Sequence, residues 1–338
     1  MGARAGALAL AIALAACSAA PRPSSTATLS ATPATVPTAT AGPTPTGTPE
    51  TLTPDALVAL VDAPALMEHL EALQAVADAN DGNRATGSAG FEASVDYVAS
   101  ALEAAGYVVE RRAFDARGVP SANLIADRLG SSDDVIVVGA HLDSVVAGPG
   151  INDNGSGVAA LLVIAEALAG LPAPRHTFRF AFWGAEEGGP FGSAAYVEAL
   201  DSAERDRIVA YLSFDMLASP NAVRFVYDEA GAAPGSDRLT DLFAATMDTA
   251  GLAWEPIDLE GDSDHGPFSD AGIPTGGLFS GGIEPVTDAQ AEAFGAVAGE
   301  PADPCSHRAC DTIDNVDTGT LEEMARIIAG VLVELAVP

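Results

Sequence analysis

The sequence predicts an α/β fold in which helices pack on a central sheet. From Asp55 onward, helical and strand patterns alternate along the chain, which is typical of layered α/β domains. Two short, mainly apolar runs, VIVVG at 135–139 and TFRFAFW at 177–183, have the composition of central strands. With 48% apolar residues, the chain can also bury a sizeable core. Residues 55–338 show no internal repeat and no gap that would separate a second domain, so we expect one domain there.

The spacing of apolar residues gives the expected elements in order. Residues 55–79 have helical spacing, and a polar loop at 81–90 separates them from a helix at 91–105. Four more helices are expected, at 157–169, about 190–200, 236–251 and 318–336. The expected strands lie at 107–109, 123–126, 135–139, 177–183, 208–214, 223–227 and 275–279.

The first residues resemble a targeting segment. Arg4 supplies a positive charge, and residues 6–14 form an apolar stretch too short to span a bilayer permanently. The stretch ends in LAAC at 14–17, which resembles the lipobox of bacterial lipoproteins, where the signal is removed before an acylated cysteine. We expect a signal peptide over residues 1–16 and a lipid at Cys17 that anchors the protein to the membrane outside the cytoplasm. An ordinary signal peptide cleaved nearby is the alternative.

Residues 17–54 have the composition of a disordered tether. They are dominated by Ala, Thr, Ser and Pro, and they contain almost nothing to bury apart from Leu29 and Val36. Such a segment does not offset the entropy of ordering. If Cys17 carries the lipid, Cys305 and Cys310 remain as an even pair in an oxidising compartment. We therefore expect a disulfide between them, with two free thiols as the alternative.

The charge of the chain argues against one class of partner. The formal net charge is −32, and all fifteen basic residues are Arg, because the sequence contains no Lys. An acidic surface repels the phosphates of nucleic acids, so we expect no nucleic-acid partner. The same charge fits adaptation to salt or solubility alone. It does not reveal the oligomeric state, for which a monomer is the simplest expectation.

Polar residues gather where the predicted strands end. Ligands of open α/β sheets bind beyond the carboxyl ends of the strands, so these residues are expected at one edge of the sheet. A glycine-rich loop at 148–155 adds one more carboxylate at the start of a helix. The residues concerned are His141, Asp143, Asp153, Glu186, Glu187 and Asp215. Singly, such residues cap turns, fill a core or face solvent, but together their imidazole and carboxylate groups suit zinc.

Seven motifs follow one another in the domain: GAHLDSV, GPGINDNGSG, FWGAEEGG, SFDM, SDHGPF, AGIP and HRACDTIDN. Together they resemble metallopeptidase family 28, the bacterial secreted aminopeptidases with a pair of zinc ions. The resemblance extends from about Asp55 to the C-terminus. It implies a three-layer α/β/α sandwich around a mixed, mostly parallel sheet, two zinc ions per chain, and the removal of N-terminal residues from peptide substrates.

The resemblance also implies five zinc ligands. His141 and Asp215 would complete one zinc site, Glu187 and His307 the other, and Asp153 would bridge the two ions. Each ion would then have one neutral and one anionic ligand besides the shared carboxylate. Two metal ions about 3.5–4 Å apart need such a bridging group.

Two neighbouring carboxylates would have supporting roles. By the resemblance, Glu186 is the general base that takes a proton from water and passes it to the leaving amine, and Asp143 orients the imidazole of His141. The Asp153–Asn154 peptide bond is expected to be cis. Because the two cysteines flank His307, their disulfide would stiffen the loop that carries this ligand.

The expected substrate contacts are less closely tied to the family pattern. The best-known secreted members have Tyr where this chain has Ser306 and often Arg where it has Asp262, so these two positions depart from the family pattern at the expected substrate contacts. His265 is a candidate contact with the oxyanion or the substrate, or a histidine that is hydrogen-bonded for structure. Asp262 would add negative charge for a substrate ammonium group, whereas Arg308 is the main cation in the motif loops that a substrate carboxylate could use.

Four other functions remain open from the sequence. A carboxypeptidase or dipeptidase would share the fold and the zinc ligands. A glutaminyl cyclase would use one zinc ion, and a binding module would have lost its ligands, although here the set is intact. A serine hydrolase is disfavoured because Ser156 lies in NGSG and not in the GxSxG motif.

Overall fold

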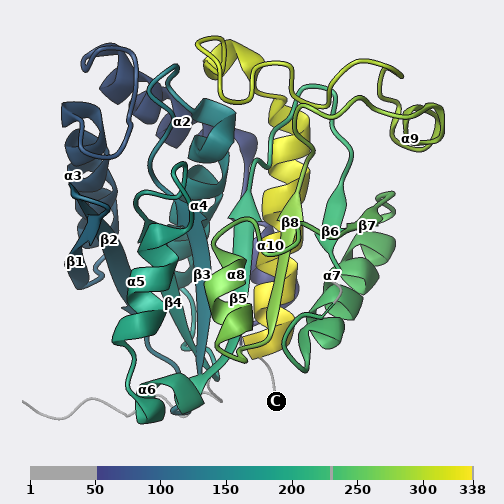
Figure 1. Cartoon of the computed structure of the whole chain (residues 1–338). Coiled ribbons are helices and arrows are strands. Elements are labelled where there is room, and N and C mark those ends of the chain that lie inside the picture. The colour runs from purple at the N-terminus through teal and green to yellow at the C-terminus, as the bar shows by residue number, and fades with distance from the viewer. Residues whose placement is uncertain (1–51, 229–230, 337–338) are drawn as a thin grey trace, which may run out of the picture. The chain divides into compact units, whose positions relative to one another are not determined.

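An eight-stranded mixed sheet forms the centre of the structure, a computed structural model that describes residues 52–228 and 231–336. The strands are β1 (Val109–Ala116), β2 (Val119–Arg128), β3 (Val135–His141), β4 (Thr177–Trp183), β5 (Ile208–Asp215), β6 (Phe225–Tyr227), β7 (Glu255–Ile257) and β8 (Thr275–Phe279). Their order across the sheet is β1-β2-β4-β3-β5-β8-β6-β7 (Figure 1). The central strands β4, β3, β5 and β8 are parallel, whereas β1, β2 and β6 pair antiparallel with their inner neighbours.

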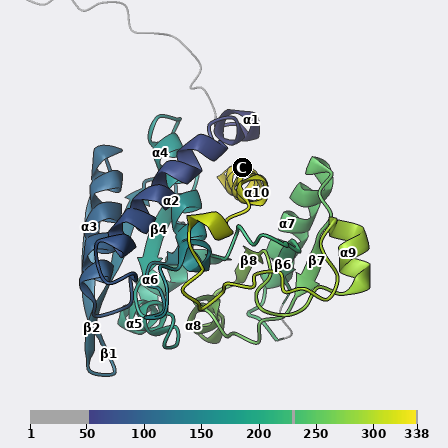
Figure 2. The same ribbon diagram turned by 90° about the horizontal axis from the view of Figure 1, so that it is seen from above.

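Helices cover both faces of this sheet. They are α1 (Pro54–Val58), α2 (Ala63–Asp78), α3 (Ala89–Ala104), α4 (Ser156–Ala169), α5 (Phe191–Ala199), α6 (Ser202–Arg207), α7 (Ser236–Ala250), α8 (His265–Asp270), α9 (Asp288–Phe294) and α10 (Thr318–Ala336). Seen from above, α2 and α10 lie on one side of the sheet, and α5 and α8 lie on the other (Figure 2). The predicted three-layer α/β/α arrangement with a mixed, mostly parallel sheet is confirmed.

Strand β3 shows why the sheet needs helices on both faces. All seven of its residues are buried. Val135 and Val137 pack into the second-largest apolar cluster, on the side of α5 and α8. Ile136 and Val138 pack into the larger cluster, which contains the buried faces of α2, α4 and α10. Because successive side chains of a strand point to opposite faces, a continuous apolar run indicates a strand that is buried on both faces.

Several predicted elements differ in detail from the structure. The single helix expected at 55–79 is two helices, because Asp62 caps α2 by accepting the N–H of Ala65 at 2.9 Å and Pro64 occupies its first turn. The short strand expected at 107–109 is instead the longer β1, which pairs with β2 as a hairpin. The short elements α6, α8, α9 and β7 were not predicted, since each is too short to show a period.

The predicted signal peptide, the lipid site at Cys17 and most of the predicted tether lie outside the described residues. Leu52, at the end of the predicted tether, is buried against the larger apolar cluster. Within residues 52–228 and 231–336, no helix is both long and apolar enough to cross a membrane.

Candidate metal centre

Three neighbouring parallel strands bring the polar residues together. His141 ends β3, Asp215 ends β5, and Glu186 and Glu187 follow the end of β4. Because β3 pairs with β4 on one side and β5 on the other, the carboxyl ends of all three strands meet at one edge. This is the edge at which the sequence placed the site.

The loop that carries Asp153 is fastened to the end of β5. The Asp153–Asn154 peptide bond is cis. The side chain of Asn154 donates to the carbonyl oxygen of Phe214 at 2.8 Å and accepts the N–H of Gly157 at 2.9 Å. A Cβ on Gly157 would lie 2.5 Å from the same carbonyl oxygen, so only glycine permits α4 to start this close to β5.

Left-handed backbone conformations occur beside the candidate ligands. Among the described residues, six that are not glycine have positive φ, and three of these are at the site. Ala185 precedes Glu186 (φ 62°), Met216 follows Asp215 (φ 50°), and His307 itself has φ 57°. Non-glycine residues adopt this region at a cost, and such residues cluster at functional sites.

Two histidines share one carboxylate. Asp153 Oδ1 lies 3.3 Å from His141 Nε2, and Asp153 Oδ2 lies 3.2 Å from His307 Nε2. Each histidine also faces a carboxylate of its own, with Asp215 Oδ1 3.3 Å from His141 Nε2 and Glu187 Oε2 3.2 Å from His307 Nε2. The side chain of His141 is 1% exposed and that of His307 is 62% exposed. The two halves therefore have the same chemistry but differ in access to solvent.

The donor set fits metal ions. His141 Nε2 and Asp215 Oδ1 are buried, yet within the described residues neither makes a hydrogen bond of acceptable geometry. Ligand atoms of His141, Asp153 and Glu187 lie within 4.8 Å of one another. Buried polar atoms without partners are costly, and crowded carboxylates need positive charge. Imidazole and carboxylate ligands in this arrangement suit zinc.

The crowding also changes the acidity of the candidate ligands. Burial, and next the negative charge of Asp153, raises the pKa of Glu187 to about 8. The hydrogen bond with Asp153 raises the pKa of His307 to about 9. The Glu187 shift thus comes first from loss of solvent and the His307 shift from its hydrogen bond with Asp153, and nearby acidic groups add to both.

Glu186 lies near His141 without pairing closely with it. Its Oε2 is 4.0 Å from His141 Nε2, and its side chain is 14% exposed. Burial raises the pKa of Glu186 well above its usual range, and the negative charges of Asp264 and Asp215 raise it further. The backbone N–H of Glu186 donates to Asp143 Oδ1 at 3.0 Å. Glu186 is therefore a partly buried carboxyl group that borders the candidate ligands.

Asp143 contacts His141 mainly through its backbone. The Nδ1 atom of His141 lies 3.1 Å from the carbonyl oxygen of Asp143 and 3.8 Å from its carboxylate. The carboxylate instead accepts the hydroxyl of Thr86 at 3.2 Å as well as the N–H of Glu186. Asp143 thus links the strand end that carries His141 to the loop that carries Glu186.

A cleft of about 990 Å³ opens over the candidate metal ligands. Asp262 and Arg308 line it, together with apolar residues that include Phe225, Ile257 and Phe279. His265 does not line this cleft. It is fully buried at the start of α8, where its ring packs edge-on to Tyr227 at 5.0 Å. Of the three candidate substrate contacts, the structure therefore brings two to the cleft.

Arg84 was not identified from the sequence. It is fully buried and donates to the carbonyl oxygens of Pro149 at 2.9 Å and Gly150 at 2.6 Å, and also to that of Leu142. One guanidinium group thereby ties the residue after His141 to the loop that carries Asp153. Arg84 lies in a polar loop that has no periodic pattern of apolar residues. Nothing in the sequence therefore distinguishes it from an exposed arginine.

Comparison with known proteins places the chain in a family. Residues 123–332 match the sequence profile of Peptidase family M28. The chain belongs to this family. Its M28 domain is 44% identical over 281 residues to leupeptin-inactivating enzyme 1 of Streptomyces exfoliatus, covering 82% of this chain and 61% of that protein. It is also 46% identical to the probable lipoprotein aminopeptidase LpqL of Mycobacterium tuberculosis, over 59% of this chain and 42% of that protein. The chain thus spans about two-fifths to three-fifths of these relatives.

Solved structures share the fold of this M28 chain. An aminopeptidase from Aneurinibacillus sp. strain AM-1 has a TM-score of 0.71 and 19% identity, covering 85% of this chain and 97% of that one. A glutaminyl cyclase from Porphyromonas gingivalis has a TM-score of 0.64 and 20% identity, covering 82% of this chain and 99% of that one. At such identities the likeness establishes the fold alone, and the reaction has to be argued from the site.

Proposed function

We propose that this M28 domain is a zinc-dependent aminopeptidase that removes N-terminal residues from peptides and holds two zinc ions. The observation that carries the proposal is the carboxylate of Asp153, which turns one oxygen toward each of two histidines. Such a carboxylate can offer one oxygen to each of two ions, as a bridging ligand does. The proposed ligands are His141, Asp153, Glu187, Asp215 and His307.

The protein side of the chemistry centres on Glu186. When bound, the zinc ions would supply Lewis acidity to the scissile carbonyl group and lower the pKa of water. Glu186 is left out of the ligand set, so its carboxylate remains available to take a proton from the attacking water. Glu186 would then pass that proton to the leaving amine. The cleft above it is wide enough to admit a peptide end.

The charges at the site favour recognition of an amine. Glu186, Asp215 and Asp262 line the same cleft, and carboxylates are natural partners for the α-ammonium group of a peptide. Arg308 is the cation in that lining that a C-terminal carboxylate could use. We propose that these carboxylates determine which end of a peptide binds and outweigh Arg308. The enzyme would then bind free N-termini.

Cleavage should therefore depend on a free N-terminus. We expect hydrolysis of a short peptide with a free amine, and a loss of cleavage on N-acetylation, because the acetyl group removes the positive charge. C-terminal amidation should have little effect. Comparing kcat/KM for the free, acetylated and amidated forms of one peptide tests this. Equal cleavage of the acetylated form, or loss of cleavage on amidation, would contradict the proposal and favour an endopeptidase or a carboxypeptidase.

We also propose that the protein is a lipoprotein held outside the cytoplasm. The lipobox-like LAAC at 14–17 supports this, as does similarity to a relative named as a probable lipoprotein aminopeptidase. We expect the protein to fractionate with membranes and Cys17→Ser to release or mislocalise it. Mass spectrometry of the mature protein checks the prediction directly. A mature N-terminus other than an acylated Cys17 would refute the anchor and leave the enzyme proposal untouched.

A further inference from the structure

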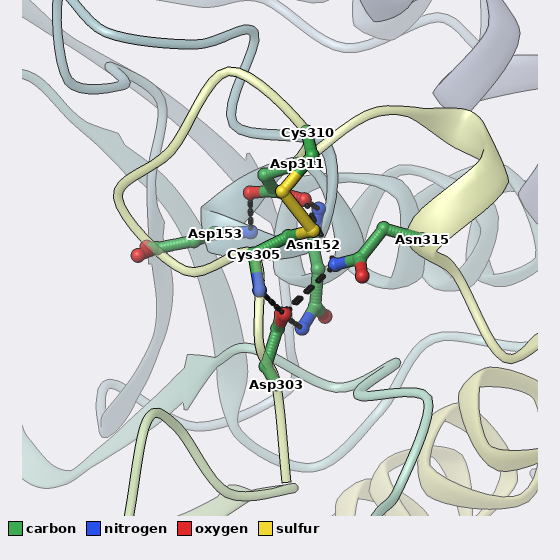
Figure 3. Close-up of a disulfide and its surroundings, with 7 residues drawn as sticks. All are labelled: Asn152, Asp153, Asp303, Cys305, Cys310, Asp311 and Asn315. Carbon is green, nitrogen blue, oxygen red and sulfur yellow. Dashed lines mark hydrogen bonds between the residues drawn. A yellow bond between two sulfur atoms is a disulfide. The ribbon is translucent and has the colours of Figure 1, made fainter. Parts of the chain in front are cut away.

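One short segment, residues 303–315, contacts the loop of Asp153 and also carries His307. A disulfide joins Cys305 and Cys310, whose Cα atoms are 5.2 Å apart, so His307 lies within the closed loop. Asp311 directly follows this loop and is 1% exposed. Figure 3 shows its carboxylate beside the backbone of Asp153, whose own side chain points away from the disulfide.

Asp311 binds three consecutive N–H groups of the loop. Its carboxylate accepts the N–H of Asn152 at 2.8 Å through Oδ1 and the N–H of Asp153 at 3.0 Å through Oδ2. Its carbonyl oxygen accepts the N–H of Ile151 at 3.2 Å. The backbone that leads into Asp153 is thus held by one residue from a distant part of the chain.

Asp303 holds the same loop from a second direction. Its carboxylate accepts the side-chain amide of Asn152 at 2.6 Å, that of Asn315 at 2.9 Å and the N–H of Cys305 at 2.7 Å (Figure 3). The side chain and the backbone of Asn152 are therefore both bound by residues 303–315. Because the peptide between Asn152 and Asp153 has little freedom left, the direction of the Asp153 side chain is set from this segment.

We propose that Asp311 is a positioning residue that aims the carboxylate of Asp153 at both histidines, and that the disulfide loop sets Asp153 and His307 as one unit. The inference rests on the proposed zinc site. Asp153 reaches His141 and His307 at 3.3 and 3.2 Å with different oxygens, so rotation of its backbone would move one oxygen away. Each oxygen of the Asp311 carboxylate accepts one of the two adjacent N–H groups, an arrangement that an amide, with one acceptor oxygen and one NH₂ group, does not reproduce.

The test is Asp311→Asn in the full chain, which keeps the shape but turns an NH₂ donor toward one backbone N–H. We expect zinc affinity, measured by competition with a chromophoric chelator, to weaken about 10–100-fold, as is typical when the partners of metal ligands are lost. The absorption spectrum of the cobalt-substituted protein should change too, because the ligand geometry changes. The matched control is Asp314→Asn, which removes the same charge at an exposed position of the same segment and should change neither.

A second variant tests whether the segment acts as one unit. Replacing both Cys305 and Cys310 by Ser should also weaken zinc binding, and its effect combined with Asp311→Asn should be less than additive, since both act through one loop. Additive effects would contradict a single unit. If Asp311→Asn does not fold, the cysteine variant decides alone, and unchanged zinc affinity in that variant overturns the inference.

The remaining outcomes separate the two proposals. If the unmodified protein binds no zinc, the proposed function fails. If it binds two ions and Asp311→Asn matches Asp314→Asn in affinity and cobalt spectrum, only the role of Asp311 is overturned. The free energy of unfolding of the metal-free protein identifies a purely structural role. A variant that is less stable without metal but unchanged in zinc affinity would make Asp311 an anchor of the fold and not a positioning residue.

Discussion

Replacement of Glu186 by Gln is expected to lower kcat by about 10²–10⁴-fold while both zinc ions stay bound. The amide keeps the size of the side chain but cannot take a proton from water. Glu186 lies 4.0 Å from His141 Nε2 and is not required to complete either ligand set, so its charge is dispensable for metal binding. Steady-state kinetics and elemental analysis of the same preparation measure the two quantities.

The matched variant is Glu187→Gln, one residue further along. It removes the carboxylate that faces His307 at 3.2 Å, and we expect it to lose zinc as well as activity. The two adjacent substitutions should therefore have different effects on zinc content. Glu186→Gln should keep the zinc ions and lose the base, whereas Glu187→Gln should lose a zinc ligand. If Glu186→Gln loses zinc and Glu187→Gln retains it, the roles of the two residues have been exchanged.

Replacement of Asp153 by Ala is expected to reduce the zinc content from two ions per chain to less than one and to abolish measurable hydrolysis. No other carboxylate among the described residues lies between the two histidines, so its loss affects both halves of the site. Elemental analysis after mild dialysis measures the content. Asp237→Ala, at an exposed position in the first turn of α7, should retain two ions.

The unmodified protein provides the sharper test of the bridging role. If it is fully active with one zinc ion or none, no shared carboxylate is needed, and the two-ion proposal fails even though the fold stands. If Asp153→Ala keeps one ion firmly, Asp153 belongs to one half of the site only. These outcomes distinguish a bridging ligand from an ordinary one.

The strand ends could be predicted from the sequence because their physics is local. VIVVG and TFRFAFW are buried on both faces, and such runs stand out in any sequence. A polar residue directly after such a run must lie at the end of a strand, and parallel neighbours bring their ends together. The positions of His141, Glu187 and Asp215 at this edge therefore follow from pattern and topology. Their proposed roles as ligands, the choice of Glu187 over Glu186, and His307 come from the resemblance to the family motifs.

The supporting residues could not be predicted because their partners are distant in the sequence. Arg84 binds carbonyl oxygens about sixty residues away, and Asp311 binds N–H groups more than 150 residues away. Neither contact leaves a periodic trace, since each depends on how loops pack after the sheet has formed. The edge strand β1 was predicted too short for a related reason: its exposed charges in VERRAFDA mask the alternation that marks a half-buried strand.

The unequal exposure of the two histidines has a consequence for exchange with the medium. His141 is sealed by the sheet, whereas most of the His307 side chain is open to solvent. In the proposed two-ion site, chelators and competing cations would reach His307 from bulk solvent, whereas they would reach the His141 half only from the cleft, through Asp215. The two zinc positions would then empty and fill in order. The ion at His307 would leave first and return last. The rigidity of the disulfide loop would then control the dissociation rate of the ion at His307.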